Sequence, residues 1–174
     1  GLPLADVGKT DGNSRYEESF LDQLADMDIT PSTIDLVAFS HMHYDHVGAA
    51  NAFTNSTLLI QETEAVAAFE HPEDNPVFRA ELYNELMAVN RRSLNGDYDV
   101  FGDGSVRIIS APGHTPGHQV LYLELSNYGP LILSGDLYHF EVSRTLRRVP
   151  VFNTNVEETL NSMDKIEELL VTSG

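Results

Sequence analysis

The chain has 174 residues, of which 41% are hydrophobic, so it matches one domain of roughly 100–200 residues. It has no Cys, which excludes disulfide stapling, thiolate metal sites and Cys nucleophiles. A net charge of −17 argues against nucleic acid as a partner, and no segment approaches the roughly 20 apolar residues of a membrane-spanning helix.

Hydrophobic periodicity predicts alternating helices and strands in the first half of the chain. Phe20, Leu21, Leu24 and Met27 recur at helical spacing, and Thr30-Pro31-Ser32 ends that pattern. In chain order we predict a helix over 16–27, a strand over 34–39, a short helix over 47–53, a strand over 57–61, and helices over 63–69 and 76–92.

The second half begins with a turn at Asn95-Gly96-Asp97, followed by three strands over 106–110, 120–125 and 131–133. Thr154 and Glu157 have the spacing of a capping box, which predicts a helix whose apolar face carries Leu160, Met163, Ile166 and Leu170. Strands that alternate with helices predict an α/β layered fold, and the lack of a long linker predicts a single domain over 1–174.

The densest chemical motif directly follows the strand over 34–39. His41, His43, Asp45 and His46 lie within six residues, and side chains at i and i+2 of an extended segment share a face. Imidazole nitrogen and carboxylate oxygen are ligands for Zn²⁺, and also for Mn²⁺, Fe²⁺ or Co²⁺. The spacing favours metal ligands over the alternative of surface or outer-shell histidines.

Two further motifs also follow apolar strands. In the segment 111–118, tight Pro-Gly turns hold His114 and His118, and one of these two is expected to bind metal. Asp136 follows Gly135 at the end of the third strand. A lone Gly-Asp is more often a turn than a ligand, but the two histidine motifs make Asp136 a candidate metal bridge.

Together these motifs resemble the metallo-β-lactamase-fold hydrolases, and most closely their N-acyl homoserine lactonase branch. The resemblance covers residues 41–136 and continues more loosely to Tyr138, His139 and Arg144-Thr145. It implies an αβ/βα sandwich, in which His114 rather than His118 is the ligand of the second motif. It also implies that Asp136 is the bridging carboxylate.

The resemblance further implies a mechanism with two zinc ions. His41, His43 and His114 would hold the first ion, Asp45 and His46 the second, and Asp136 would bridge them. A metal-bound hydroxide would then open a lactone or ester, with N-acyl homoserine lactones, the substrates of quorum quenching, favoured. The resemblance assigns Asp45 to proton delivery. Tyr138 and His139 are candidates for hydrogen bonding to the substrate carbonyl.

The sequence departs from the family pattern at both ends. It lacks the family's early strands, and no His follows His139, so the final metal-binding imidazole is missing. We therefore expect a metallo-β-lactamase-like domain that is truncated at both ends.

The remaining candidate residues have simpler interpretations. We expect His118 to hydrogen-bond behind the ligands and His71 to be a solvated loop residue. Phe69, Phe78, Tyr83 and Met87 are candidates for an acyl-chain pocket, although helical spacing favours ordinary core or lid packing.

The sequence is also compatible with two other functions. One is an organophosphate or thioester hydrolase, because the same metal pair attacks other centres. The other, of a different class, is a non-catalytic metal-binding or interaction module. A homodimer is compatible with the sequence. A cytoplasmic location is favoured, with the periplasm or secretion as alternatives if a signal was removed.

Overall fold

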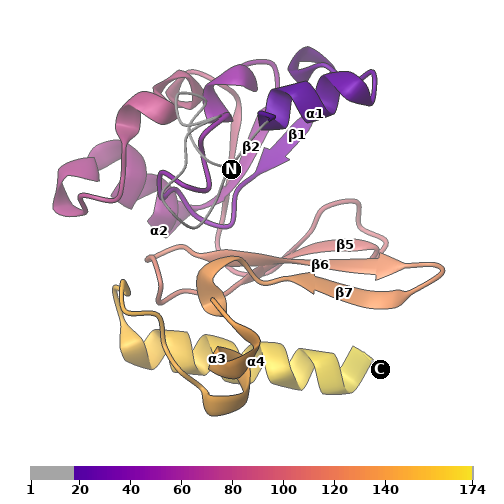
Figure 1. Cartoon of the computed structure of the whole chain (residues 1–174), viewed down its shortest axis with the longest axis vertical. Coiled ribbons are helices and arrows are strands. Elements are labelled where there is room, and N and C mark those ends of the chain that lie inside the picture. Colours follow the sequence, from indigo (N-terminus) through magenta and orange to yellow (C-terminus); the bar gives the residue numbers. More distant parts are fainter. Residues whose placement is uncertain (1–17, 174) are drawn as a thin grey trace. The chain divides into compact units, whose positions relative to one another are not determined.

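The computed structural model describes residues 18–173, and Figure 1 shows their helices and strands. Within this range the contacts define two compact units. The first unit comprises residues 18–60 and 66–92, and the second comprises residues 61–65 and 93–173. Among the residues described, no helix has the length and apolar character required to cross a bilayer.

The first helix, α1 (Phe20–Asp26), begins at a capping box formed by Ser19 and Asp22. Ser19 Oγ accepts a hydrogen bond from the Asp22 N–H at 3.1 Å, and Asp22 Oδ2 accepts one from the Ser19 N–H at 3.0 Å. These bonds satisfy N–H groups that lack a partner inside the helix. The predicted helix is therefore confirmed in its central part but begins at Phe20; residues 16 and 17 lie outside the described range.

Parallel pairing in the first sheet explains where the histidine motif lies. The sheet has the order β1 (Leu36–Ala38), β2 (Thr57–Gln61), β3 (Arg91–Leu94), and β1 pairs in parallel with β2. Parallel neighbours require a crossover. Residues 39–56 form this crossover, so they leave the carboxyl end of β1. The predicted helix over 47–53 shrinks to a 3-10 turn, η3 (Ala50–Ala52), while the strand over 57–61 is confirmed.

The predicted helix over 63–69 is confirmed, although it changes type along its length. It forms as α2 (Glu62–Ala65), which continues as the π-helical turn η4 (Val66–Glu70). A further 3-10 turn, η5 (Pro72–Asp74), follows.

The predicted helix over 76–92 is wrong. This segment contains only the 3-10 turns η6 (Ala80–Leu82) and η7 (Asn84–Met87) before β3 begins. The Asn51 side chain donates to Glu81 O at 2.9 Å and accepts from the Glu85 N–H at 3.0 Å. These contacts, which span 30 and 34 residues, take backbone groups that a continuous helix would pair internally.

The second unit is a sheet covered by a long helix. Its four antiparallel strands have the order β4 (Tyr98–Asp99), β5 (Val106–Ser110), β6 (Gln119–Leu125), β7 (Gly129–Leu133), which confirms the three predicted strands. Helix α4 (Val156–Ser173) runs along this sheet (Figure 1). The buried core that joins them contains Ile109, Ala111, Val120, Tyr122, Leu137, Met163 and Ile166.

The start of α4 differs from the predicted capping box. Asn155 Oδ1 accepts hydrogen bonds from the N–H groups of Glu157 and Glu158 at 3.1 and 3.2 Å, so Asn155 caps the helix. The Thr154 hydroxyl instead donates to His114 O at 3.1 Å. The Thr154 side chain, which the local spacing predicted as the cap, is therefore hydrogen-bonded to a carbonyl group 40 residues away.

Two Arg–carboxylate pairs fasten α3 (Glu141–Leu146), a helix that the periodicity did not predict, to α4. Arg144 binds Glu167 in a bidentate manner, with N···O distances of 2.7 and 2.8 Å. The second pair joins Arg147 to Asp164. Arg147 occupies the left-handed region (φ 51°) just past the end of α3. Bidentate geometry is specific, but both pairs are solvent-accessible and each contributes little to stability.

Replacing Glu167 by Gln is expected to lower the free energy of unfolding by less than about 1 kcal/mol at pH 7. The hydrogen bond from Arg144 holds the pKa of the Glu167 carboxyl below its usual value. Its contribution is therefore present above the unfolded pKa of about 4.3 and is lost as the pH falls through the lower, folded value. Urea unfolding of both proteins from pH 7 to pH 3 measures this difference.

Glu168→Gln is the matched control, because it removes the same charge from an exposed position one residue further along α4. It should show a smaller effect, because Arg144 pairs with Glu167. An equal pH dependence for both variants would contradict a specific role for the Arg144–Glu167 pair.

Candidate metal centre

Three imidazoles converge in the first unit, in the crossover that follows β1. His41 Nε2 and His43 Nδ1 lie 3.0 Å apart, and these two residues are only 1% and 4% exposed. The rings of His41 and His46 are 4.1 Å apart between centroids. Ser40 Oγ lies 3.1 Å from His41 Nδ1 and 3.3 Å from His46 Nδ1, so one hydroxyl orients both rings.

Asp45 lies at the more open side of this group. One of its carboxylate oxygens is 3.6 Å from His46 Nε2, and its side chain is 42% exposed, against 25% for His46. The structure therefore brings all four residues of the first motif into one neighbourhood. The exposure of Asp45 leaves its carboxylate accessible to solvent and to a ligand.

Asn75 is a contact of this cluster that the sequence motif did not reveal. Its amide nitrogen lies 3.2 Å from His43 Nε2, and the Phe78 ring packs 5.3 Å from the His43 ring. Phe78 therefore packs on a histidine of the cluster, and its role in an acyl-chain pocket stays a prediction. Asn75 follows His43 by 32 residues, in a segment with no recognisable spacing, so nothing in the sequence indicated this contact.

The second unit carries its own donor cluster, centred on Asp136. Asp136 Oδ2 lies 3.3 Å from His114 Nε2 and 3.1 Å from His139 Nε2. One ligand atom from each of these three residues lies within 4.8 Å of the others, which is the spacing of a potential metal site. His139, predicted as a substrate contact, is therefore also placed as a donor beside Asp136.

The loop that carries His114 is held by hydrogen bonds along its backbone. All five carbonyl oxygens of residues 110–114 accept a hydrogen bond, mostly from α4 and the residues just before it. Ser110 O accepts from Lys165 Nζ (2.9 Å), Ala111 O from His118 Nδ1 (3.1 Å), and Pro112 O from Ser162 Oγ (2.7 Å). Gly113 O accepts from the N–H groups of Thr154 and Asn155 (2.9 and 2.8 Å). His114 O accepts from the N–H and the hydroxyl of Thr154 (both 3.1 Å).

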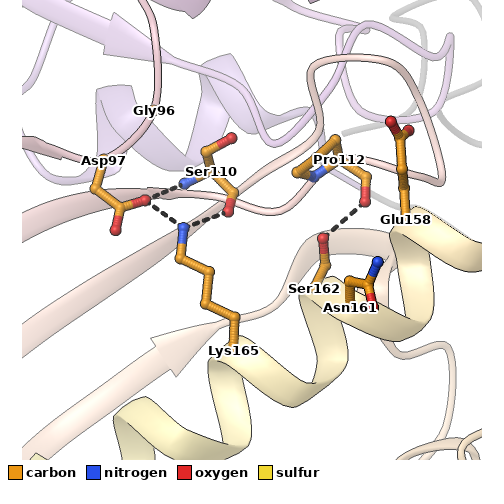
Figure 2. Close-up of a pocket in the computed structure, with 8 residues that line it drawn as sticks. All are labelled: Gly96, Asp97, Ser110, Pro112, Glu158, Asn161, Ser162 and Lys165. Atoms are coloured by element: carbon orange, nitrogen blue, oxygen red, sulfur yellow. Dashed lines mark hydrogen bonds and ion pairs between the residues drawn. The ribbon is translucent and has the colours of Figure 1, made fainter.

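Figure 2 shows the outer part of this attachment, in which Lys165 and Ser162 reach from α4 to Ser110 and Pro112. Lys165 also pairs with Asp97 at 2.6 Å, and Asp97 accepts from the Ser110 N–H at 2.9 Å. A pocket of about 560 Å³ lies among these residues. The loop therefore cannot shift without breaking several hydrogen bonds, which keeps the His114 imidazole in a defined position.

Tyr138 lies beside a carboxylate of α4. Its hydroxyl donates to Glu167 Oε1 at 3.1 Å, between α3 and α4. Burial raises the pKa of Tyr138 well above its ordinary value, and the Glu167 carboxylate raises it further. The phenol therefore stays protonated at neutral pH and donates a hydrogen bond to Glu167. A contact between Tyr138 and substrate stays a prediction, and it requires release of this hydrogen bond.

The remaining histidine and aromatic residues considered from the sequence differ in their burial. His71 is exposed, as expected for a solvated loop residue, while Tyr83 is fully buried and donates its hydroxyl to Ala68 O at 3.1 Å. Phe69 packs against Tyr83 with centroids 5.7 Å apart, whereas Met87 is 58% exposed. Tyr83 is therefore a core residue, and the half-buried Phe69 packs on it.

The donor groups fit divalent metal ions. Two ligands at about 2.0–2.1 Å from a tetrahedral ion lie about 3.3 Å apart. The separations between His41 and His43 nitrogens (3.0 Å) and between Asp136 and the nitrogens of His114 and His139 (3.3 and 3.1 Å) are close to this value. Such spacing suits ions with a preference for imidazole and carboxylate.

Comparison with known proteins agrees with this donor chemistry. The profile of the metallo-beta-lactamase superfamily matches residues 6–171. The chain belongs to this superfamily. Membership, together with the His and Asp clusters, indicates that the protein binds metal.

The curated relatives of this superfamily member include N-acyl homoserine lactonases. It is 29% identical to AttM of Azorhizobium caulinodans, with 92% of this chain and 62% of the relative covered. It is 32% identical to AttM of Rhizobium radiobacter, with 86% and 59% covered. The chain thus spans about three fifths of the length of these relatives.

Solved structures confirm the metallo-beta-lactamase fold. An N-acyl homoserine lactone hydrolase, with the product N-hexanoyl-L-homoserine at its catalytic metal centre, superposes with a TM-score of 0.83 at 28% identity. That match covers 99% of this chain and 70% of the solved chain. A quorum-quenching N-acyl homoserine lactone lactonase matches with a TM-score of 0.84 at 27% identity.

Proposed function

We propose that the protein containing this chain is a metal-dependent hydrolase that opens lactone rings, with N-acyl homoserine lactones as the favoured substrates. The observation that carries this proposal is the placement of Asp136 within 3.3 Å of one imidazole and 3.1 Å of another in a superfamily member similar to lactonases. Imidazole and carboxylate are donor types that divalent transition metals accept, which supports Asp136 as a ligand.

The proposed ligands are divided between two ions. His41, His43 and His114 would hold the first, Asp45 and His46 the second, and Asp136 would bind both. Zinc is the proposed metal, with two ions in the intact protein, and Mn, Fe or Co are alternatives that the same ligands accept. When bound, these cations supply Lewis acidity and make water a nucleophile near neutral pH.

Hydrolysis of a lactone adds water across the acyl C–O bond. The water oxygen bonds to the carbonyl carbon, the ring C–O bond breaks, and the ring oxygen takes a proton to become an alcohol. We assign the movement of that proton to Asp45, and the accessible carboxylate beside His46 supports this assignment. His139, which is also partly exposed beside Asp136, is the proposed hydrogen-bond donor to substrate.

A substrate panel tests the proposal. Purified protein loaded with zinc should hydrolyse N-acyl homoserine lactones with a higher kcat/KM than a phosphotriester or a glutathione thioester. Preference for either of the latter would assign the alternative hydrolase activity. Stoichiometric zinc without turnover of any substrate would instead support a non-catalytic metal-binding module. Homodimerisation stays a prediction, which sedimentation equilibrium checks.

A further inference from the structure

His118 links the two loops of the second unit that carry proposed ligands. It is completely buried, and its ring Nδ1 lies 3.1 Å from Ala111 O, at the start of the His114 loop. Its Nε2 lies 3.0 Å from the backbone nitrogen of Asp136. A backbone hydrogen bond also joins Ala111 and His118, because the Ala111 N–H donates to His118 O at 2.9 Å.

The chemistry of these two contacts determines where the ring carries its proton. A carbonyl oxygen only accepts, so the Nδ1 that faces Ala111 O must carry a hydrogen. A backbone N–H only donates, so the Nε2 that faces Asp136 must offer its lone pair. Both contacts are satisfied together only by neutral His118 in the Nδ1–H tautomer.

The contact with Asp136 has a structural reason. Residues 134–138 contain the turn η8 (Gly135–Leu137), in which Asp136 departs from helical geometry with φ −93° and ψ 18°. Its N–H is thereby directed to a side chain rather than into a regular helix. The imidazole that accepts this hydrogen bond sets the orientation of the residue whose carboxylate meets His114 and His139.

We propose that His118 is a positioning residue for the metal centre, and that it acts by accepting the Asp136 N–H while it anchors the start of the His114 loop. This inference rests on the proposed function, since it treats Asp136 and His114 as ligands. His118 is not itself a proposed ligand. Loss of an outer contact of this kind typically weakens metal binding by about 10- to 100-fold.

Two substitutions separate the two ring contacts. The amide nitrogen of Asn stands where Nδ1 stands, so His118→Asn keeps the donor to Ala111 O and loses the acceptor for Asp136. The longer Gln side chain places its amide oxygen near the Nε2 position, so His118→Gln keeps that acceptor. We expect zinc affinity, measured by competition with a chromophoric chelator, to fall about 10- to 100-fold in His118→Asn. His118→Gln should retain most of it.

Tyr122→Phe is the matched control. Tyr122 is 3% exposed on β6, the strand that begins directly after His118, and its hydroxyl donates to Glu124, which is not a proposed ligand. This variant should lose stability without loss of zinc affinity. Thermal unfolding of each metal-free variant shows whether a change in zinc affinity exceeds the change in stability.

The tautomer gives a second test that needs no variant. Nitrogen NMR of the wild-type ring should show a protonated Nδ1 and an unprotonated Nε2 for His118. The opposite tautomer would overturn the proposal, as would unchanged zinc affinity in folded His118→Asn or equal losses in folded His118→Asn and His118→Gln. Zinc binding without lactone turnover by wild type would instead reject the proposed activity and leave the positioning role to be judged on affinity alone.

Discussion

Replacing Asp136 by Asn is expected to lower kcat/KM for lactone hydrolysis by about 10²- to 10³-fold, equivalent to about 3–4 kcal/mol of transition-state stabilisation. The substitution preserves shape but removes the negative charge that lies 3.3 Å from His114 Nε2 and 3.1 Å from His139 Nε2. An amide is a much poorer metal ligand than a carboxylate. Steady-state kinetics on an N-acyl homoserine lactone, with zinc content measured on the same samples, checks the result.

The control for this prediction is Asp103→Asn. Asp103 is an exposed loop residue that accepts hydrogen bonds from Ser105, so its substitution changes the net charge by the same amount away from the donor cluster. It should keep wild-type zinc content and kinetics. Full zinc content and an unchanged rate in Asp136→Asn would show that this carboxylate does not serve the metal centre.

Gly113→Ala is expected to have the largest effect on stability, with a loss of at least about 3 kcal/mol. Gly113 has φ +132°, a conformation that residues with a side chain rarely adopt. In addition, a Cβ there would lie 2.6 Å from Thr159 Cα, within the first turns of α4. Because the obstacle is helix backbone, relief requires α4 to move away from the His114 loop. Urea unfolding measures the loss.

Substitutions at two other glycines separate the cost of a positive φ from the cost of a steric clash with the new Cβ. Gly102 has φ +77° with nothing within 4 Å of a Cβ, so Gly102→Ala should lose only about 1 kcal/mol from backbone conformation. Gly117 lacks a positive φ, but its Cβ would lie 2.8 Å from Glu64 Cα. Gly117→Ala therefore tests collision alone. If Gly113→Ala cost no more than Gly102→Ala, close packing of α4 on the loop would not be a source of stability.

Local sequence patterns were reliable where local interactions determine the structure. The strand over 106–110 has the predicted bounds: Ile108 and Ile109 are both buried, and Ile109 belongs to the core shared with α4. The strand over 57–61 also has the predicted bounds, and its apolar residues Leu58, Leu59 and Ile60 are all buried. In both segments the same apolar residues form the local pattern and make the tertiary contacts.

Predictions from local patterns were wrong where hydrogen bonds to distant residues replaced the expected local ones. The helical spacing of Leu82, Leu86 and Val89 predicted a helix, but Asn51 binds the backbone at Glu81 and Glu85. Thr154 had capping spacing, but the carbonyl of His114 took its hydroxyl. A hydrogen bond from a residue 30 or more positions away leaves no periodic trace in the sequence.

By itself the sequence determined the donor types, their order along the chain and the strand ends on which they lie, because a dense run of imidazoles and carboxylates has few purposes other than metal binding. Only the tertiary structure decided how those donors are held. It showed His139 beside Asp136, Tyr138 bound to Glu167, and His118 joining the turn of Asp136 to the loop of His114. The reason is physical: ligand chemistry belongs to a residue, whereas orientation depends on hydrogen bonds that exist only after folding brings distant residues together.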